Sequence, residues 1–279
     1  MSSFKKGLYI VSTPIGNLED ISLRALSILK NSDFIYCEDT RHSSKLLNYY
    51  KIKKKLISNH KFNEKSQVAK AIEYLKQGKI LSLISDSGTP ILSDPGNILV
   101  KECIDNNINI HTIPGASAVI SAITCSGFDS KFLFWGFLPK KQGEQTGVLK
   151  NLKKNENTLV FFVPAVKFAF YLKFFKEYFF DRKIVIAREM TKLHEEYIRG
   201  EVNNIELSKI NLKGELTVVI SEKKNKKVDI SNVELKKMVK STLRKKSVKD
   251  TVQYIASKNN ISKKIIYQMC LEINENKNN

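Results

Sequence analysis

Short apolar runs alternate with segments of helical periodicity from the start of this chain to about residue 113. The predicted strands cover residues 8–12, 34–37, 55–58, 80–84 and 109–113. Apolar residues at helical spacing between them predict helices over residues 22–30, 43–50, 64–77 and 97–106. This alternation is typical of a mostly parallel sheet with helices on both faces. The sequence therefore predicts the α/β class.

The pattern breaks at Pro114-Gly115, which predicts a domain boundary near Gly115. A helix rich in small residues is predicted over residues 117–126, and a second set of strands over residues 132–137, 158–163, 184–188 and 215–220. Residues 140–157 are polar and charged, which predicts a mobile connection. We expect two α/β domains, residues 1–114 and 115–222, followed by a tail over residues 223–279.

The tail is strongly basic. It begins with EKKNKKVD, which predicts a solvated linker, and continues with two candidate helices over residues 248–258 and 262–273. Seven basic residues lie close together there: Arg244, Lys245, Lys246, Lys249, Lys258, Lys263 and Lys264. Two interpretations remain open, a helical pair that caps the second domain or a basic arm that binds RNA.

Composition limits the class of protein. The formal net charge of +19 favours a nucleic-acid partner, although only six of the 47 basic residues are Arg and a general bias towards Lys would also explain it. The N-terminal segment lacks the apolar core of a signal peptide, and the most apolar stretch is broken by Pro164 and Lys167. The four cysteines lack disulfide or metal spacing. We expect a reduced cytoplasmic protein without a metal or a membrane span.

Four loops rich in Gly, Pro, Ser, Thr and Asp follow predicted strands: TPIGN, EDTRHSS, SDSGTPILSDPG and PGASA. All four leave the carboxyl ends of their strands, where open α/β sheets bind ligands. Glycine lets the backbone approach a ligand closely, and free N–H groups there bind oxygen atoms. The four loops therefore predict a ligand cleft at one edge of the sheet.

The usual short motifs do not identify the ligand. The chain has no GxGxxG after its first strand, no GxxxxGK[ST] and no GxSxG, and its four His lack zinc-ligand spacing. Asp86 and Asp94 would suit a pair of hydrolytic carboxylates, but both lie in turn-forming segments where Asp commonly has a structural role. The residues alone predict a two-domain α/β protein with a cleft for a small polar ligand.

Five ordered segments carry a family resemblance: LYIVSTPIGNLEDISLRALSIL, EDTRHSSKLL, LISDSGTPILSDPG, PGASAVISAITCSGF and AREMTKLHEE. They resemble the tetrapyrrole methylase superfamily and, more narrowly, the ribosomal RNA small subunit methyltransferase I family of 16S rRNA 2′-O-ribose methyltransferases. The resemblance implies a homodimer that holds S-adenosylmethionine between two α/β domains. It implies a decoding-centre cytidine of the small ribosomal subunit as the substrate.

The same resemblance implies the site residues. The cofactor-binding residues would be Pro14, Asp86, Ser87, Gly88, Ile91, Ser117 and Ala118. A ribose hydroxyl is a poor nucleophile at neutral pH, so a carboxylate that accepts its proton would help. The candidates are Asp39, Glu189 and Glu195, of which at most one is the base. The RNA-binding candidates are Arg24, Arg41, Arg188, Lys192 and His194.

One segment departs from the family pattern. Relatives usually have Tyr-Glu-Ser-Pro-His-Arg after the strand that begins at Thr158, whereas this chain has Phe162-Val163-Pro164-Ala165-Val166-Lys167. The acid, the hydroxyl and the imidazole are absent. Two alternatives to the rRNA methyltransferase therefore remain: a methylase of a tetrapyrrole or a protein side chain on the same fold, and an RNA-binding relative without activity.

Overall fold

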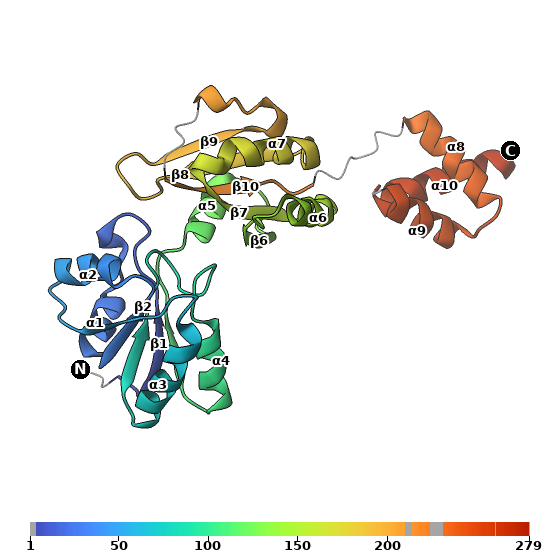
Figure 1. The fold of residues 1–279 in the computed structure, drawn as a ribbon. Helices are drawn as coiled ribbons and strands as arrows, with labels where there is room; N and C mark the ends of the chain where they lie inside the picture. The colour runs from blue at the N-terminus through green and yellow to red at the C-terminus, as the bar shows by residue number, and fades with distance from the viewer. Residues whose placement is uncertain (1–3, 210–213, 224–230, 260, 279) are drawn as a thin grey trace. The chain divides into compact units, whose positions relative to one another are not determined.

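The computed structural model describes residues 4–209, 214–223, 231–259 and 261–278 (Figure 1). The chain divides into two compact units, Met1–Lys223 and Lys224–Asn279. The first unit contains two five-stranded sheets, and the second unit is helical. None of the helices in the described part of the chain is long and apolar enough to cross a membrane.

The first sheet is entirely parallel, in the order β3-β2-β4-β1-β5. Its strands are β1 (Gly7–Val11), β2 (Phe34–Cys37), β3 (Lys55–Ser58), β4 (Ile80–Leu83) and β5 (Ile110–Ile113). In β1, which lies between β4 and β5, Leu8 is paired with Leu81 of β4 and with Ile110 of β5. The carboxyl ends of all five strands therefore lie at one edge of the sheet.

Helices cover both faces of this sheet. They are α1 (Leu23–Asn31), α2 (Thr40–Tyr49), α3 (Glu64–Lys76) and α4 (Asn97–Asp105), with a short 3₁₀ turn, η1 (Leu18–Asp20). Successive residues of β1 point to opposite faces: Tyr9 packs with α1 and α2, whereas Leu8 packs with α3 and α4. The predicted parallel α/β arrangement is confirmed. Helix α2 begins three residues earlier than predicted, because Asp39 caps it.

The second sheet is mixed, in the order β6-β7-β10-β8-β9. Its strands are β6 (Phe132–Phe137), β7 (Thr158–Pro164), β8 (Lys183–Arg188), β9 (Glu196–Glu201) and β10 (Glu215–Ile220). Only β6 and β7 are parallel, and the other pairs are antiparallel. Short 3₁₀ turns follow β7 and β9: η2 (Ala165–Lys167), η3 (Val202–Asn204) and η4 (Leu207–Lys209).

Three helices enclose the second sheet. Helix α5 (Ala118–Ser126) packs on the face that includes Val160, while α6 (Gln142–Lys153) and α7 (Phe168–Tyr178) pack on the face that includes Phe161. Figure 1 shows α5 and α7 on opposite sides of this sheet. Strands β7, β8 and β10 therefore bury both of their faces, as their apolar sequences require.

Helix α6 and strand β9 differ from what the sequence predicted. Residues 140–157 were predicted to be a mobile connection, but α6 forms there because it buries Leu149 and Leu152 and because the buried Gln145 amide donates to the Pro139 carbonyl at 2.6 Å. The edge strand β9 has the sequence EYIRGE, whose charges hid its strand character; it pairs with β8 along its whole length.

The described residues of the second unit form three helices rather than the two predicted: α8 (Asn232–Leu243), α9 (Val248–Asn259) and α10 (Lys263–Asn278). A capping box begins α8, since Ser231 accepts from the N–H of Glu234 while the Glu234 carboxylate accepts from that of Ser231. The hydrophobic core of this second unit includes Val239, Ile255 and Ile266. Most of the predicted linker EKKNKKVD lies outside the described residues.

Candidate active site

Hydrogen bonds join the loops that follow β1 and β4. The N–H of Thr13 donates to the Gly88 carbonyl at 2.9 Å, and the N–H of Gly88 donates back to the Thr13 carbonyl at 3.1 Å. The Thr13 hydroxyl also donates to the Ser85 carbonyl at 3.2 Å. An antiparallel bridge between Thr13 and Gly88 therefore joins the two loops beyond the ends of the parallel strands β1 and β4.

The loops after β5 and β2 join the same cluster. The Thr89 hydroxyl donates to the Ala116 carbonyl and accepts from the Ser12 hydroxyl, each at 3.1 Å. On the other side, the N–H of Asp39 donates to Asp86 Oδ1 at 3.1 Å. All four predicted loops therefore meet at one edge of the sheet, as the sequence analysis expected.

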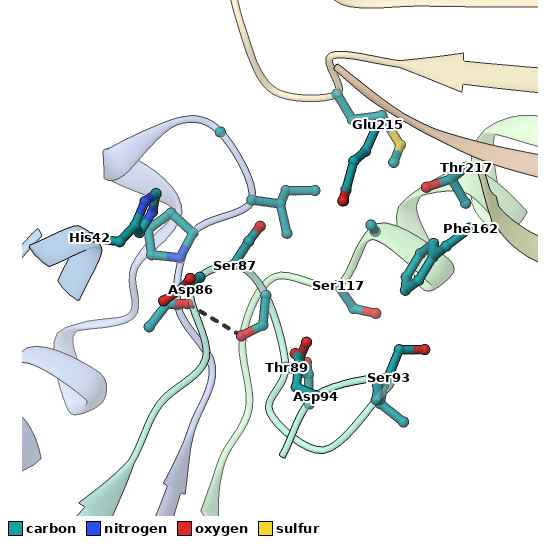
Figure 2. A pocket seen from close by; sticks show the side chains of 18 of the residues that line it. His42, Asp86, Ser87, Thr89, Ser93, Asp94, Ser117, Phe162, Glu215 and Thr217 are labelled. Carbon is teal, nitrogen blue, oxygen red and sulfur yellow. Dashed lines mark hydrogen bonds between the residues drawn. The ribbon is translucent and has the colours of Figure 1, made fainter. Parts of the chain in front are cut away.

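A pocket of about 920 Å³ lies between these loops and the second sheet. Figure 2 shows Glu215, Thr217 and Phe162 across the pocket from Asp86 and Ser87. Pockets of this size accommodate drug-sized ligands. Because its two walls come from different sheets, a ligand in the pocket would contact both.

The two walls also contact each other directly. The N–H of Asn17, after β1, donates to Thr191 Oγ1 at 3.0 Å. A Cβ on Gly16 would lie 2.7 Å from the Met190 carbonyl oxygen, and a Cβ on Gly136 would lie 2.8 Å from Ser93 Oγ. Glycine at these two positions therefore allows the loops of the first sheet to approach the second sheet closely.

The N-terminus of α5 faces the pocket. Ser117 is its N-cap, and its hydroxyl accepts from the N–H of Ile120 at 3.5 Å. Ser117 and Ala118 both line the pocket. The free N–H groups and the dipole of a helix N-terminus favour an anionic group, such as a carboxylate.

Another part of the pocket lining is acidic. The carboxyl groups of Glu38, Asp86, Asp94 and Glu215 lie there. Burial and, after it, the negative charges of Glu38, Asp86 and Glu215 together raise the pKa of Asp94 to about 7, while the Ser85 hydroxyl opposes them. Burial, followed by the Asp86 charge, also raises the pKa of Glu38. The pocket therefore combines an anion-binding helix end with a wall that favours a cation.

Six of the seven predicted cofactor-binding residues line the pocket: Pro14, Asp86, Ser87, Gly88, Ser117 and Ala118. Ile91 does not; it packs in the core of the first sheet, where a Cβ on Gly96 would lie 3.1 Å from Ile91 Cγ1. Glu38 stands in the quoted loop EDTRHSS and Phe162 in the segment that departs from the family pattern, but neither was predicted to line a pocket. Glu215 was not predicted either, since the sequence alone carries no signal for it. Asp94 was interpreted as a turn former or a hydrolytic carboxylate.

The three candidate bases lie in different environments. Glu189 lines the pocket, and its Oε1 accepts from Lys192 Nζ at 3.0 Å. Asp39 lies in an adjoining pocket of about 380 Å³, where Arg41 binds both of its carboxylate oxygens. Those hydrogen bonds hold the pKa of Asp39 well below its usual range. Glu195 accepts from the N–H of Thr191 at 2.5 Å and does not line either pocket.

The RNA-binding candidates are scattered. Lys192 lines the main pocket, and Arg41 lines the adjoining one with its side chain 88% exposed. Arg188 is buried and pairs with Glu196 at 3.0 Å. Arg24 is exposed on α1, and His194 is exposed between β8 and β9. The structure therefore brings Arg41 and Lys192 to the two pockets but not the other three.

The segment that departs from the family pattern lies mostly away from the pocket. Phe162 faces the pocket, whereas its neighbour Val163 is buried in the core on the opposite face of β7. Val166 is 82% exposed beyond the strand. The valine that replaces the acid therefore completes a core and removes no group from the pocket wall.

Comparison with known proteins agrees with this architecture. The family model for tetrapyrrole (corrin/porphyrin) methylases matches residues 7–206. Ribosomal RNA small subunit methyltransferase I of Thermotoga maritima is 46% identical over 219 residues, covering 77% of this chain and 98% of the relative. The enzyme of the same name from Rickettsia prowazekii is 42% identical over 271 residues, covering 95% of this chain and 96% of the relative.

Solved structures share the fold at low sequence identity. Diphthine synthase superposes with a TM-score of 0.60 at 14% identity, covering 77% of this chain and 89% of that protein. A uroporphyrin-III C-methyltransferase from Thermus thermophilus, complexed with S-adenyl homocysteine, superposes with a TM-score of 0.56 at 14% identity, covering 77% and 97%. The chain belongs to the tetrapyrrole methylase family and, within it, to the family of ribosomal RNA small subunit methyltransferase I.

Proposed function

We propose that this protein transfers a methyl group from S-adenosylmethionine to the ribose 2′-hydroxyl of a decoding-centre cytidine in 16S rRNA of the small ribosomal subunit. The observation that carries the proposal is the pocket at the four loops. It occurs in a chain that is 46% identical to a relative named ribosomal RNA small subunit methyltransferase I. The two walls give the pocket room for both a cofactor and a nucleoside.

The pocket residues fit S-adenosylmethionine. Gly88 has a φ of +76°, a conformation that favours glycine and brings its backbone to the pocket without a side chain. Ser117 and Ala118 offer a helix N-terminus to the carboxylate of the methionine part. The carboxyl groups of Asp86, Asp94 and Glu215 favour a positively charged ligand. When bound, S-adenosylmethionine supplies an activated methyl group on a cationic sulfur.

The protein's own contribution is alignment, charge and proton transfer. Its two walls hold the reactants in contact, which accounts for much of the acceleration in reactions between two bound molecules. Lys192 at the pocket and Arg41 at the adjoining pocket are suited to hold RNA phosphates. A carboxylate in the pocket accepts the hydroxyl proton. Of the candidate bases predicted from the sequence, Glu189 is the one that lines the main pocket.

The two alternatives gain no support from the pocket. The loss of the acid at Val163 motivated a role without catalysis, but that position lies in a core rather than in the pocket wall. A methylase of tetrapyrroles or of a protein side chain would share the fold, but the relatives with high identity carry the rRNA name.

The test is methyl transfer to small ribosomal subunits prepared from a strain that lacks this enzyme. With S-adenosylmethionine labelled in its methyl group, we expect the label on a single cytidine, resistant to alkaline cleavage at its 3′ side because the 2′-oxygen is methylated. Label on a base, or on a ribosomal protein, would contradict the assignment. The same assay with naked 16S rRNA shows whether the enzyme acts on free RNA or on the assembled subunit.

We also propose that the protein is a cytoplasmic homodimer, as the family resemblance implies. Light scattering of the full chain at micromolar concentration tests the assembly. A mass equal to one chain at all concentrations would contradict the dimer.

A further inference from the structure

Asp94 lies in the pocket wall on a tightly held segment. Ile91 and Ser93 have φ values of +76° and +77°, which non-glycine residues rarely adopt. The Glu64 carboxylate accepts from the N–H of Gly96 at 2.9 Å, and Ser93 lies against the bulge at Gly136. Strained conformations persist only where the surrounding structure fixes them, and they gather at functional sites. These contacts fix Asp94 at the pocket.

The charges that face Asp94 are negative. Glu38 from the loop after β2, Asp86 from its own loop and Glu215 from β10 all act on its carboxyl group, and together with burial they raise its pKa to about 7. No ion pair of Asp94 occurs among the described residues. Lys45, His42 and Lys192 line the same pocket, but Lys192 pairs with Glu189.

The three acids predicted from the sequence as candidate bases are engaged by other groups. Asp39 is held by Arg41, Glu189 by Lys192 and Glu195 by a backbone N–H. A carboxylate that already binds a cation or donor is a weaker proton acceptor. Given the proposed methyl transfer, we infer that the Asp94 carboxylate is the group that accepts the proton of the acceptor hydroxyl.

In the proposed step, every bond and proton is accounted for. The hydroxyl oxygen forms a bond to the methyl carbon, the carbon–sulfur bond breaks with its electron pair left on sulfur, and the hydroxyl proton passes to Asp94. The positive charge of the sulfonium is thereby lost from the pocket. Because that charge favours ionised Asp94 before the transfer and is absent afterwards, Asp94 becomes a stronger proton acceptor as the reaction proceeds. The proton then leaves to solvent.

The kinetic test measures single-turnover methyl transfer to small subunits between pH 5.5 and 9. For the unchanged protein we expect the rate to rise with an inflection and then level. Asp94→Asn should lower the rate by about 10²-fold or more and remove that inflection. Glu215→Gln should move the inflection to lower pH, since one neighbouring negative charge is gone. Asp105→Asn, an exposed acid at the end of α4, is the matched control and should change neither quantity.

A second test needs no RNA. Binding of S-adenosylmethionine and of S-adenosylhomocysteine is measured by calorimetry at pH 7 in buffers of different ionisation enthalpy. The cationic ligand should release more protons than the neutral-sulfur product, because the pKa of Asp94 lies near neutral pH and a cation beside it favours its ionised form. Asp94→Asn should abolish that difference and still bind both ligands, while Asp105→Asn should preserve the difference.

The outcomes separate the two proposals. If the unchanged protein methylates no RNA but Asp94→Asn abolishes the difference in proton release, the rRNA assignment fails and Asp94 stands as the proton acceptor of another methyl transfer. If a folded Asp94→Asn protein keeps the rate and pH profile of the unchanged protein, the inference is overturned. It is equally overturned if Asp94→Asn leaves the difference in proton release intact.

Discussion

Two aspartates in neighbouring loops differ because of what surrounds each carboxyl group. Asp39 caps α2 and binds Arg41 through both oxygens, so it stays ionised over the whole neutral range. Asp94 is half-buried among other carboxyl groups, so it titrates near neutral pH. The same residue type therefore serves as a structural cap in one loop and as a proton-exchanging group in the other.

Gly88 is expected to be essential for ligand binding. It has a φ of +76°, and a Cβ there would lie 3.1 Å from Ile15 Cγ2, at the pocket. Gly88→Ala should weaken S-adenosylmethionine binding by at least tenfold in calorimetric titration. Gly127→Ala is the matched control, because Gly127 has a φ of +73° with no atom within 4 Å of its Cβ position. If the two variants bind S-adenosylmethionine with equal affinity, Gly88 would matter only through its backbone conformation and not through the space that it leaves in the pocket.

Asp94 should make stability depend on pH. In the unfolded chain it loses its proton near pH 4, whereas in the folded protein it does so near pH 7. Between these values the folded state binds more protons, so this group lowers the free energy of unfolding as the pH rises from about 4 to about 7. Asp94→Asn should therefore raise the urea midpoint more at pH 8 than at pH 5. A shift of the same size at both pH values would contradict the raised pKa.

At the scale of elements, one buried side chain connects two helices and the site loop. Glu64 begins α3 and is 7% exposed, and its Oε1 accepts from the N–H groups of Gly96 and Ile98 at 2.9 and 3.0 Å. It therefore caps the N-terminus of α4, which has no cap of its own. The same contact fixes the end of the loop that carries Asp94.

Glu64→Ala should lower the free energy of unfolding by about 1–3 kcal/mol, because one buried and one half-buried N–H donor lose their acceptor. It should also weaken S-adenosylmethionine binding, since the loop after β4 is released. Glu73→Ala, an exposed glutamate on the same helix, is the control and should change neither property. Urea unfolding and calorimetric titration measure the two effects. A Glu64→Ala protein with the stability of the control would exclude the capping role.

At the scale of the whole molecule, the C-terminal unit has its own core and is separable. The first unit ends in bonds that hold its last strand: Glu222 accepts from the N–H of Asp129, and the N–H of Lys223 donates to the Glu156 carbonyl. The Thermotoga maritima relative bears the family name although the alignment covers 98% of it and only 77% of this chain. Truncation after Lys223 therefore leaves the pocket complete.

The truncated protein should keep its affinity for S-adenosylmethionine and lose affinity for small subunits. Lys245, Lys246 and Lys249 are exposed near the start of α9, and Lys263 and Lys264 near the start of α10. Phosphate contacts release counterions, so the salt dependence of binding should also become less steep. Filter binding at several salt concentrations measures both quantities. Unchanged affinity and salt slope would make the C-terminal unit structural and place the RNA surface near Arg41 and Lys192.

Much of the first sheet could be predicted because its signals are local. Alternating apolar runs and helical periodicity indicated parallel strands with helices on both faces, and the carboxyl-end rule brought four loops to one edge. Helix α8 also carried a local signal, the Ser231–Glu234 capping box, which the sequence analysis overlooked. In contrast, α6 depends on burial in the core of the second sheet, and the charged strand β9 depends on pairing with β8; neither contact is visible in the local sequence pattern.

The sequence by itself therefore determined the fold class, the edge of the sheet that forms the pocket and the family. Only the tertiary structure decided which acids share the pocket. Asp94, Glu38 and Glu215 come from three segments, and one of these belongs to the other sheet. The proton affinity of a carboxyl group depends on burial and on charges within a few ångströms, and folding alone brings those charges together.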